Sequence, residues 1–315
     1  MSLRLGIDLG GTKIAAVVID ATGDVVWHTR VATPRHDYAA TIDALAGVVA
    51  AGDAAVGQSC TVGVGMPGAI SPATGLVKNA NSTWLNGRPF HRDLETRLRR
   101  AVRCANDANC LAMSEAADGA AAGASVVFGV IVGTGTGGGI VVNGQGLTGA
   151  NAIAGEWGHN PLPWPDADEL PGPACYCGRH GCLETWLSGP GLANDFARRT
   201  GETARAEALV RRAAAGDVPA SDTLAAWTRR LARGLASVIN LLDPDVIVMG
   251  GGLSEIQAVY EEVPSLWSEW VFSDRVDTLL RPPQHGDASG VRGAAWLWET
   301  AEDDGRPSPW PPPAA

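Results

Sequence analysis

The chain has 315 residues and a mass of 32.5 kDa, and 45% of its residues are hydrophobic, which is enough for two packed domains. A net charge of −10 and the lack of any long basic run argue against a nucleic-acid-binding surface. We see no stretch of about 18 apolar residues and no leader peptide, so we expect a cytoplasmic protein with reduced cysteines and no membrane partner.

The amino-terminal part begins with short apolar, β-branched runs at residues 3–9, 14–19 and 25–31. Glycine-containing turns separate these runs, which predicts a three-stranded meander. Apolar residues at helical spacing predict a helix over residues 38–51. A short strand is expected over residues 61–65, and it ends in the sequence GMPG.

A second, similar round begins near residue 125. Apolar runs at residues 126–132 and 140–142 flank a glycine loop, and Asn143 and Gly144 predict a hairpin turn. Helices are expected in the later part of the chain, followed by a buried strand that three glycines stop; the helices span residues 187–200, 205–215 and 222–242, and the strand spans residues 243–249. The two rounds predict a duplicated α/β architecture with a cleft between its halves, and ligands bind such folds at the carboxyl ends of the strands.

The first glycine loop, GIDLGGTK at residues 6–13, lacks the spacing and the following helix of a P-loop. A tight turn between strands can still offer backbone N–H groups and the Thr12 hydroxyl to phosphate, with Lys13 as a nearby charge and Asp8 for hydrated Mg²⁺. An ordinary hairpin is the alternative.

The second glycine loop, GTGTGG at residues 133–138, matches a dinucleotide-binding pattern, but a strand follows it where that pattern requires a helix. We therefore favour a second phosphate clamp over a dehydrogenase. Three glycines at residues 250–252 would let a flat ring approach the backbone.

Asn106 and Asp107 end a short predicted strand. Both residue types commonly cap helices, and a helix is expected to begin near Cys110. A carboxylate at a strand end can also act as a general base toward a substrate hydroxyl that attacks the terminal phosphate of ATP. The two interpretations are compatible, since Asn106 can hold the substrate while Asp107 takes the proton.

The sequence CYCGRHGCLE at residues 175–184 places three cysteines close together. Three thiolates and one histidine are a common set of zinc ligands, and the C-x-C spacing fits a redox pair poorly. His159 is the better candidate for the fourth ligand because it would tie two segments together, whereas His180 lies within the tight turn itself. Cys60, Cys104 and Cys110 are expected to be buried small apolar residues.

Together these motifs resemble the ROK family of bacterial sugar kinases and repressors along nearly the whole chain. Residues 77–87, 156–164 and 286–296 resemble its fructokinase and manno(fructo)kinase branch. The resemblance implies a duplicated actin-like, hexokinase-type (ribonuclease H-like) ATPase fold. A smaller domain would span residues 1–110 and be joined by a helix near residues 290–299, and a larger domain with the zinc and adenosine sites would span residues 111–289. The many prolines at the end of the chain separately predict a disordered tail at residues 303–315.

The resemblance also implies roles for individual residues, with Asp107 as the catalytic base. The sugar would be held by Gly68, Asn81, Asn106, Asp107, Glu156, His159 and Glu184. The nucleotide would be held by Asp8, Gly10, Gly11, Thr12, Lys13, Gly133, Thr134, Gly135, Thr136, Gly137, Gly251 and Gly252. A structural Zn²⁺ would be held by His159, Cys175, Cys177 and Cys182.

The expected activity is ATP- and Mg²⁺-dependent phosphorylation of the 6-hydroxyl of a hexose, with D-fructose favoured, in a homodimer. Mannose, glucose or an N-acylhexosamine are alternative substrates. A sugar-responsive repressor is disfavoured because the first phosphate loop begins at residue 6, with no winged helix before it.

Overall fold

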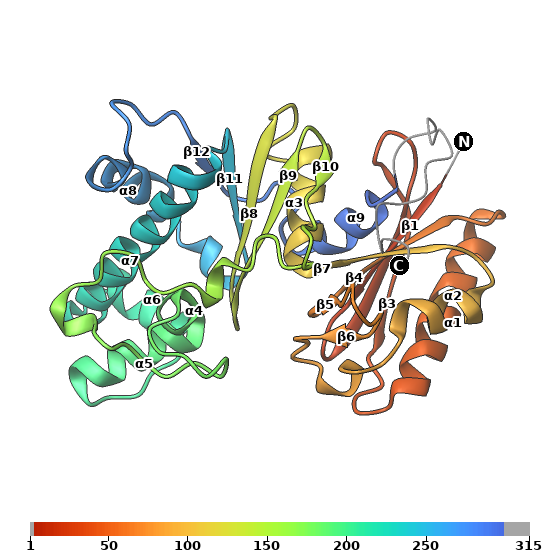
Figure 1. Ribbon diagram of the computed structural model, residues 1–315, viewed down its shortest axis with the longest axis horizontal. Coiled ribbons are helices and arrows are strands. Elements are labelled where there is room, and N and C mark those ends of the chain that lie inside the picture. The colour runs from red at the N-terminus through yellow and green to blue at the C-terminus, as the bar shows by residue number, and fades with distance from the viewer. Residues whose placement is uncertain (1–2, 299–315) are drawn as a thin grey trace. The chain divides into compact units, whose positions relative to one another are not determined.

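The computed structural model describes residues 3–298, which form two compact units (Figure 1). Of the described residues, unit 1 comprises 3–123, 139–154 and 284–298, and unit 2 comprises 124–138 and 155–283. Unit 1 extends beyond residue 110, because α3 (Asp107–Ala117) belongs wholly to it. The expected tail at residues 303–315 lies outside the described residues.

Unit 1 is built on a five-stranded sheet in the order β3-β2-β1-β4-β7. The first three strands form the predicted antiparallel meander, and β4 and β7 continue the sheet in parallel with β1. The strands are β1 (Arg4–Leu9), β2 (Lys13–Ile19), β3 (Val25–Ala32), β4 (Thr61–Met66) and β7 (Val102–Asn106), and a small antiparallel pair is formed by β5 (Ala69–Ile70) and β6 (Val77–Lys78). The carboxyl ends of β1, β4 and β7 therefore lie at one edge.

Alternation along β1 determines which side chains meet which helices. Leu5, Ile7 and Leu9 are buried in a core that also contains the apolar face of α1 (Tyr38–Val56) and residues of α2 (Phe90–Leu98). Gly6 and Asp8 point to the opposite face of the sheet, because successive side chains in a strand alternate. That face is covered by α9 (Ser289–Ala295), which packs on β1, β2, β4 and α3.

Glycines let α9 approach the sheet backbone directly. Cβ atoms added at Gly6 and Gly63 would lie 2.1 Å and 1.8 Å from carbonyl oxygens of α9. Gly293 of α9 is equally close to α3, since its Cβ would lie 1.7 Å from the carbonyl oxygen of Cys110. Any larger residue at these positions would force the helix away from its neighbours.

Helix α1 is long and apolar enough to cross a membrane, judged by length and composition alone, which corrects the expectation that the chain has no such stretch. Core helices of soluble proteins meet the same criterion. In this structure Ile42, Leu45, Val48 and Val49 of α1 are buried in the core of unit 1. We therefore regard α1 as a core helix.

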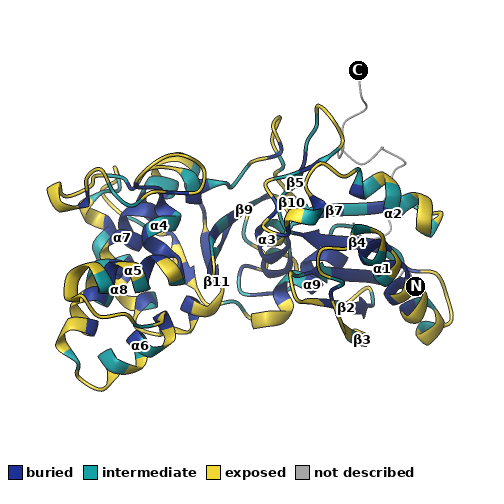
Figure 2. Cartoon of the chain, turned by 90° about the horizontal axis from the view of Figure 1, so that it is seen from below, coloured by how far each residue is buried: buried dark blue, intermediate teal, exposed yellow. Residues whose placement is uncertain are grey.

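Unit 2 contains strands of a second sheet, whose order β10-β9-β8-β11-β12 repeats the pattern of the first. The strands of this sheet are β8 (Val126–Val132), β9 (Thr136–Val142), β10 (Gln145–Gly146), β11 (Val246–Gly250) and β12 (Leu279–Arg281). The helices of unit 2 are α4 (Leu183–Leu187), α5 (Gly189–Thr200), α6 (Ala206–Ala214), α7 (Val218–Leu242) and α8 (Val259–Leu266). Figure 2 shows the buried residues of α7, which packs against the other four.

A buried ion network ties α7 to its surroundings. Arg230 Nε lies 2.7 Å from Glu169 Oε1, and Arg230 Nη1 lies 2.7 Å from Asp195 Oδ2 of α5. Arg233 Nη2 reaches the same Glu169 carboxylate at 2.7 Å. All four side chains are almost completely buried. The segment around Glu169, which leads to the cysteine cluster, is thereby anchored on α7.

Candidate functional site

The first glycine loop is a tight hairpin between β1 and β2. Gly10 N donates to Lys13 O at 3.0 Å, and Thr33, just after β3, donates to the carbonyl oxygens of both Gly10 and Thr12. Within residues 3–298, no protein acceptor receives the backbone N–H groups of Gly11 and Thr12, and both residues are exposed. Two consecutive N–H groups without a protein acceptor in the described residues, beside the exposed Lys13, are donors suited to a phosphate oxygen.

Asp8 and Asp107 lie at the carboxyl-end edge of the same sheet. Burial raises the pKa of Asp8 to about 6, and the negative charge of Asp107 adds to this rise while Lys13 opposes it. Water reaches the side chain of Asp107, yet the protein packed around it disfavours the charged form and raises its pKa as well. Among the described residues no cation is paired with Asp107, so its carboxylate is available as a base.

Asn106 serves as the N-cap of α3. Its side-chain oxygen accepts from Ala108 N at 2.9 Å, and the helix begins at Asp107, three residues earlier than expected. The side-chain Nδ2 of Asn106 donates to Gly68 O at 3.2 Å. The capping role is therefore present, and it orients Asp107 at the first position of the helix.

Gly68 occupies a position that only glycine fits well. Its backbone is left-handed with φ of 73°, and a Cβ atom there would lie 2.4 Å from the carbonyl oxygen of Lys78. The close approach of these two backbones sets the position of Gly68 O, which accepts from Asn106.

Asn81 lies in an exposed turn next to Ala80, whose backbone is held by hydrogen bonds. Asn86 bonds Ala80 by two hydrogen bonds of 2.9 Å, and Asn81 remains exposed. This segment lies beside the first glycine loop, because a Cβ at Gly11 would be 3.7 Å from Ser82 Oγ. Unit 1 thus brings its predicted sugar-binding residues close to its predicted phosphate loop.

The second glycine loop joins β8 to β9 beside the end of β11. Gly251 has φ of 87°, and a Cβ there would lie 2.5 Å from Val132 O. A Cβ at Gly133 would lie 3.8 Å from Gly252 N. The two glycine segments are therefore neighbours, as expected of residues that bind one nucleotide.

The backbone N–H groups of the second loop differ in whether they have a hydrogen-bond acceptor in the protein. Within the described chain those of Thr134 and Gly135 have no protein acceptor. The N–H of Thr136 is not free, since it donates to Glu184 Oε2 at 2.9 Å. The loop therefore offers phosphate a pair of consecutive donors, and Glu184 fixes the residue that follows them.

The predicted metal ligands meet in unit 2. One ligand atom from each of His159, Cys175, Cys177 and Cys182 lies within 4.8 Å of all the others. His159 Nδ1 is 3.5 Å from Cys175 Sγ, and Cys177 Sγ is 3.6 Å from Cys182 Sγ. Tetrahedral zinc with ordinary bond lengths requires separations of about 3.6 Å for such N–S pairs and about 3.8 Å for S–S pairs. The donor set and its spacing fit a structural zinc, and His180 is not part of it.

The second ring nitrogen of His159 contacts a tyrosine, because its Nε2 lies 2.9 Å from the hydroxyl of Tyr176. Tyr176 stands 82% exposed between two of the cysteines. This contact was not predicted from the sequence. Glu156 directly precedes the short helix that carries His159, so a metal bound by His159 would also constrain the backbone near Glu156.

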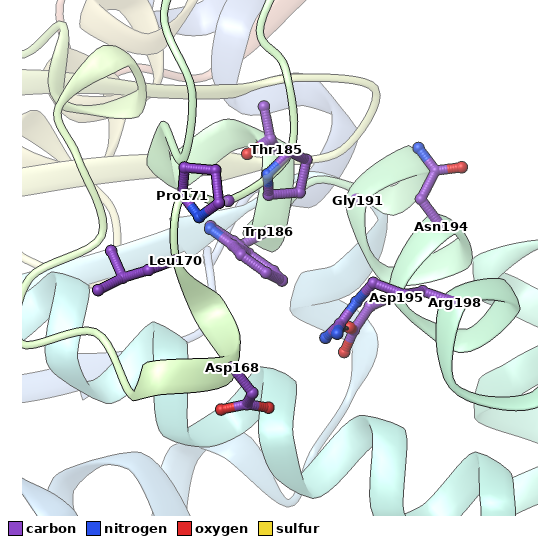
Figure 3. Close-up of a pocket in the computed structure, with 11 residues that line it drawn as sticks. Asp168, Leu170, Pro171, Thr185, Trp186, Gly191, Asn194, Asp195 and Arg198 are labelled. Carbon is purple, nitrogen blue, oxygen red and sulfur yellow. Dashed lines mark hydrogen bonds and ion pairs between the residues drawn. The ribbon is translucent and has the colours of Figure 1, made fainter.

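A cavity of about 330 Å³ lies between the segment that leads into the cysteine loop and helices α4 and α5. Figure 3 shows Trp186 central among its lining residues, which come from residues 168–173, from α4 and from α5. The indole Nε1 of Trp186 is buried without a hydrogen-bond partner in the described chain. Neither this cavity nor the Glu184 contact with Thr136 was predicted from the sequence, since both depend on how distant segments pack.

Known proteins are similar to this chain in sequence and in fold. The model of the ROK family matches residues 4–301. N-acetyl-D-glucosamine kinases of Pectobacterium atrosepticum and Erwinia tasmaniensis are 39% and 40% identical to the chain, covering 93% of it and 97% and 98% of their own lengths. A ROK hexokinase from Thermus thermophilus has a TM-score of 0.83 at 33% identity, covering 93% of this chain and 97% of its own.

A ROK family glucokinase from Streptomyces griseus, solved in complex with glucose and AMPPNP, has a TM-score of 0.75 at 29% identity, covering 94% of this chain and 99% of its own. These similarities confirm the expected hexokinase-type α/β fold. They do not support the expected fructokinase branch, because the similar curated proteins are N-acetyl-D-glucosamine kinases. The family match and the identity over nearly the whole length establish that the chain belongs to the ROK family.

Proposed function

We propose that the protein is an ATP-dependent kinase that phosphorylates the 6-hydroxyl of N-acetyl-D-glucosamine. This substrate replaces fructose as the favoured one, because relatives that carry this activity in their names are 38% to 40% identical over 93% of the chain. The glucokinase relative was solved with a sugar and a nucleotide analogue, which supports the assignment to the kinase class.

The observation that carries the proposal is the state of Asp107. Its carboxylate stands at the carboxyl end of β7 with no cation paired to it in residues 3–298, and its pKa is raised above the ordinary value. A carboxylate with a raised pKa is a stronger base, so it is better matched to accepting a proton from a hydroxyl near neutral pH. Asn106 fixes the helix start that orients this side chain.

In the proposed reaction, the 6-hydroxyl oxygen of the sugar forms a bond to the γ-phosphorus of ATP. The bond from that phosphorus to the β,γ-bridging oxygen breaks, and ADP leaves with the bridging oxygen. The hydroxyl proton passes to Asp107. Because the transition state of phosphoryl transfer carries spread negative charge, most of the catalysis comes from positioning and from charge stabilisation.

The two glycine loops supply the phosphate-binding groups in this proposal. Within residues 3–298, each offers a pair of consecutive N–H groups without a protein acceptor, from Gly11 and Thr12 in unit 1 and from Thr134 and Gly135 in unit 2. Asp8 provides a hard carboxylate oxygen of the kind that Mg²⁺ prefers, directly or through water. When bound with ATP, the ion neutralises phosphate charge.

The test is a coupled assay of ADP release with purified protein, Mg²⁺ and ATP. It compares N-acetyl-D-glucosamine, N-acetyl-D-mannosamine, glucose, mannose and fructose at equal concentrations. The proposal expects N-acetyl-D-glucosamine to have the highest kcat/KM. A higher value for fructose or glucose would replace the substrate, and no sugar-dependent ADP release with any of the five would refute the kinase assignment.

A further inference from the structure

The candidate metal cluster of unit 2 is connected to the second glycine loop by two segments that each contribute a ligand. The first segment is the short helix Trp157–His159, and the second runs from Cys182 through α4 to the start of α5. Both make hydrogen bonds to the loop. We propose that the cluster positions the second glycine loop for nucleotide phosphate, with Glu184 as the positioning residue. This proposal rests on the proposed kinase function.

Three hydrogen bonds connect the two segments to the loop. Trp157 Nε1 donates to Gly137 O at 2.9 Å, and the first N–H of α5 donates to Gly133 O at 2.7 Å. Between them Thr136 N donates to Glu184 Oε2 at 2.9 Å. The loop is therefore held at its start, its middle and its end by residues on either side of the metal ligands.

The glycine loop and these two segments are in close contact, with no room for added side chains at two glycines. A Cβ atom at Gly135 would lie 2.7 Å from Glu184 Oε2, so the carboxylate reaches the loop only because a glycine stands there. Gly158, next to the ligand His159, has no space for a side chain either, since its Cβ would lie 1.9 Å from Thr136 O. A shift of either segment would move the free N–H groups of the loop.

The segment that leads into the cysteine loop borders a cavity on one side. Residues 170–173, which lead into Cys175, line the cavity shown in Figure 3 together with α4 and α5. The ion network anchors this segment at Glu169, and at its other end Cys182 lies one residue before α4. Backbone hydrogen bonds already join the two ligand-bearing segments, since Leu162 N donates to Gly181 O at 2.9 Å and Leu183 N donates to Asn160 O at 2.8 Å. A metal bound by all four ligands would add a second connection, which would also hold the side chains of Cys175 and Cys177.

The first experiment measures binding of AMPPNP with Mg²⁺ by calorimetry, with no sugar present, alongside zinc content. Cys177→Ala removes an exposed ligand and so disturbs packing little. We expect it to lose zinc and to bind AMPPNP about tenfold or more weakly. The matched control is His180→Ala, in the same turn but outside the cluster, which should keep both zinc and affinity. A folded, zinc-free Cys177→Ala protein with wild-type affinity would overturn the proposal.

The second experiment changes no metal ligand. Glu184→Ala removes the acceptor of the Thr136 N–H, and we expect AMPPNP affinity to fall about tenfold with zinc content unchanged. Glu184→Gln keeps a carbonyl oxygen in place and should restore most of the affinity. Equal affinity in Glu184→Ala and wild type would contradict the positioning role even if Cys177→Ala fails to fold. A wild-type protein that binds no AMPPNP would instead refute the kinase function.

Discussion

Asp8 and Asp107 form a pair of carboxyl groups at one edge of the first sheet, and the charge of Asp107 adds to burial in raising the pKa of Asp8 to about 6. Below that pH Asp8 becomes protonated and loses the charge that would attract Mg²⁺. We expect kcat/KM for ATP to fall with decreasing pH, with a midpoint near 6. Asp8→Asn should lower activity and remove this limb from the pH profile; an unchanged limb would point to another group.

The same raised pKa affects stability in a defined direction. Unfolded aspartate has a pKa of about 3.9, so the folded protein holds its Asp8 proton more tightly, and stability falls as pH rises from about 4 to about 6. Asp8→Asn cannot ionise, so its stability does not fall with rising pH for this reason. Asp8 is half-buried, so water screens part of its charge. In urea unfolding we therefore expect the free energy of unfolding of Asp8→Asn, relative to wild type, to increase by on the order of 1 kcal/mol between pH 4.5 and pH 8. A constant difference at the two pH values would contradict the burial of this charge.

Replacing the proposed base tests the chemical step. Asp107→Asn keeps the size of the side chain but cannot accept the hydroxyl proton, and general-base catalysis is typically worth about 10²–10⁴-fold. We expect kcat to fall by that factor while the melting temperature stays near wild type. The control is Asp43→Asn, an exposed carboxylate on α1 that pairs with Arg97 at the surface. Near-wild-type kcat in Asp107→Asn would remove Asp107 from the mechanism.

Gly68 offers a test of the sugar-binding segment with a matched control. Gly68 and Gly75 have nearly the same φ, 73° and 69°, but a Cβ at Gly68 would collide with Lys78 O, whereas one at Gly75 meets nothing within 4 Å. Gly75→Ala should cost about 1 kcal/mol of backbone strain. Gly68→Ala should cost roughly 1–3 kcal/mol more and raise the sugar KM, because Asn106 bonds Gly68 O. Equal free energies of unfolding for Gly68→Ala and Gly75→Ala would show that the backbone around Lys78 moves to accommodate the added methyl group.

The buried network on α7 gives a prediction about stability. Burial alone would raise the pKa of Glu169, but the hydrogen bonds from Arg230 and Arg233 outweigh it and hold the pKa below its ordinary value. Glu169→Ala leaves two buried guanidinium groups without this partner, and we expect a loss of about 3–5 kcal/mol in chemical denaturation. Glu269→Ala, which breaks the exposed pair with Arg229, should cost less than about 1 kcal/mol. Similar losses would contradict the network's role.

Local patterns in the sequence predicted most of the elements. The meander of β1 to β3 followed from β-branched runs between glycine turns, and the turn at Asn143 and Gly144 has the positive φ values expected of a hairpin. Predicted ends were less accurate, because α1 runs to Val56 instead of residue 51, and the helix expected from residue 187 begins at Gly189. Ser188 caps that helix and separates it from α4.

The metal cluster was predictable because its cysteines are close in sequence and zinc imposes a ligand number. Contacts between distant residues were not. Nothing in the local sequence around Arg230 or Glu169 indicates that the two meet in the interior, since charged residues are normally exposed. The Glu184 bond to Thr136 spans 48 positions and likewise depends on tertiary packing.

The approach of α9 to Gly6 and Gly63 has a consequence for synthesis on the ribosome. Strands β1 and β4 are made well before the helix that covers their glycine-lined face, because that helix lies more than 200 residues further along the chain. Until α9 emerges, that face lacks the cover this helix gives it, and its apolar surface and backbone are open to chaperones. Unit 1 is thus completed only after all of unit 2 has been made.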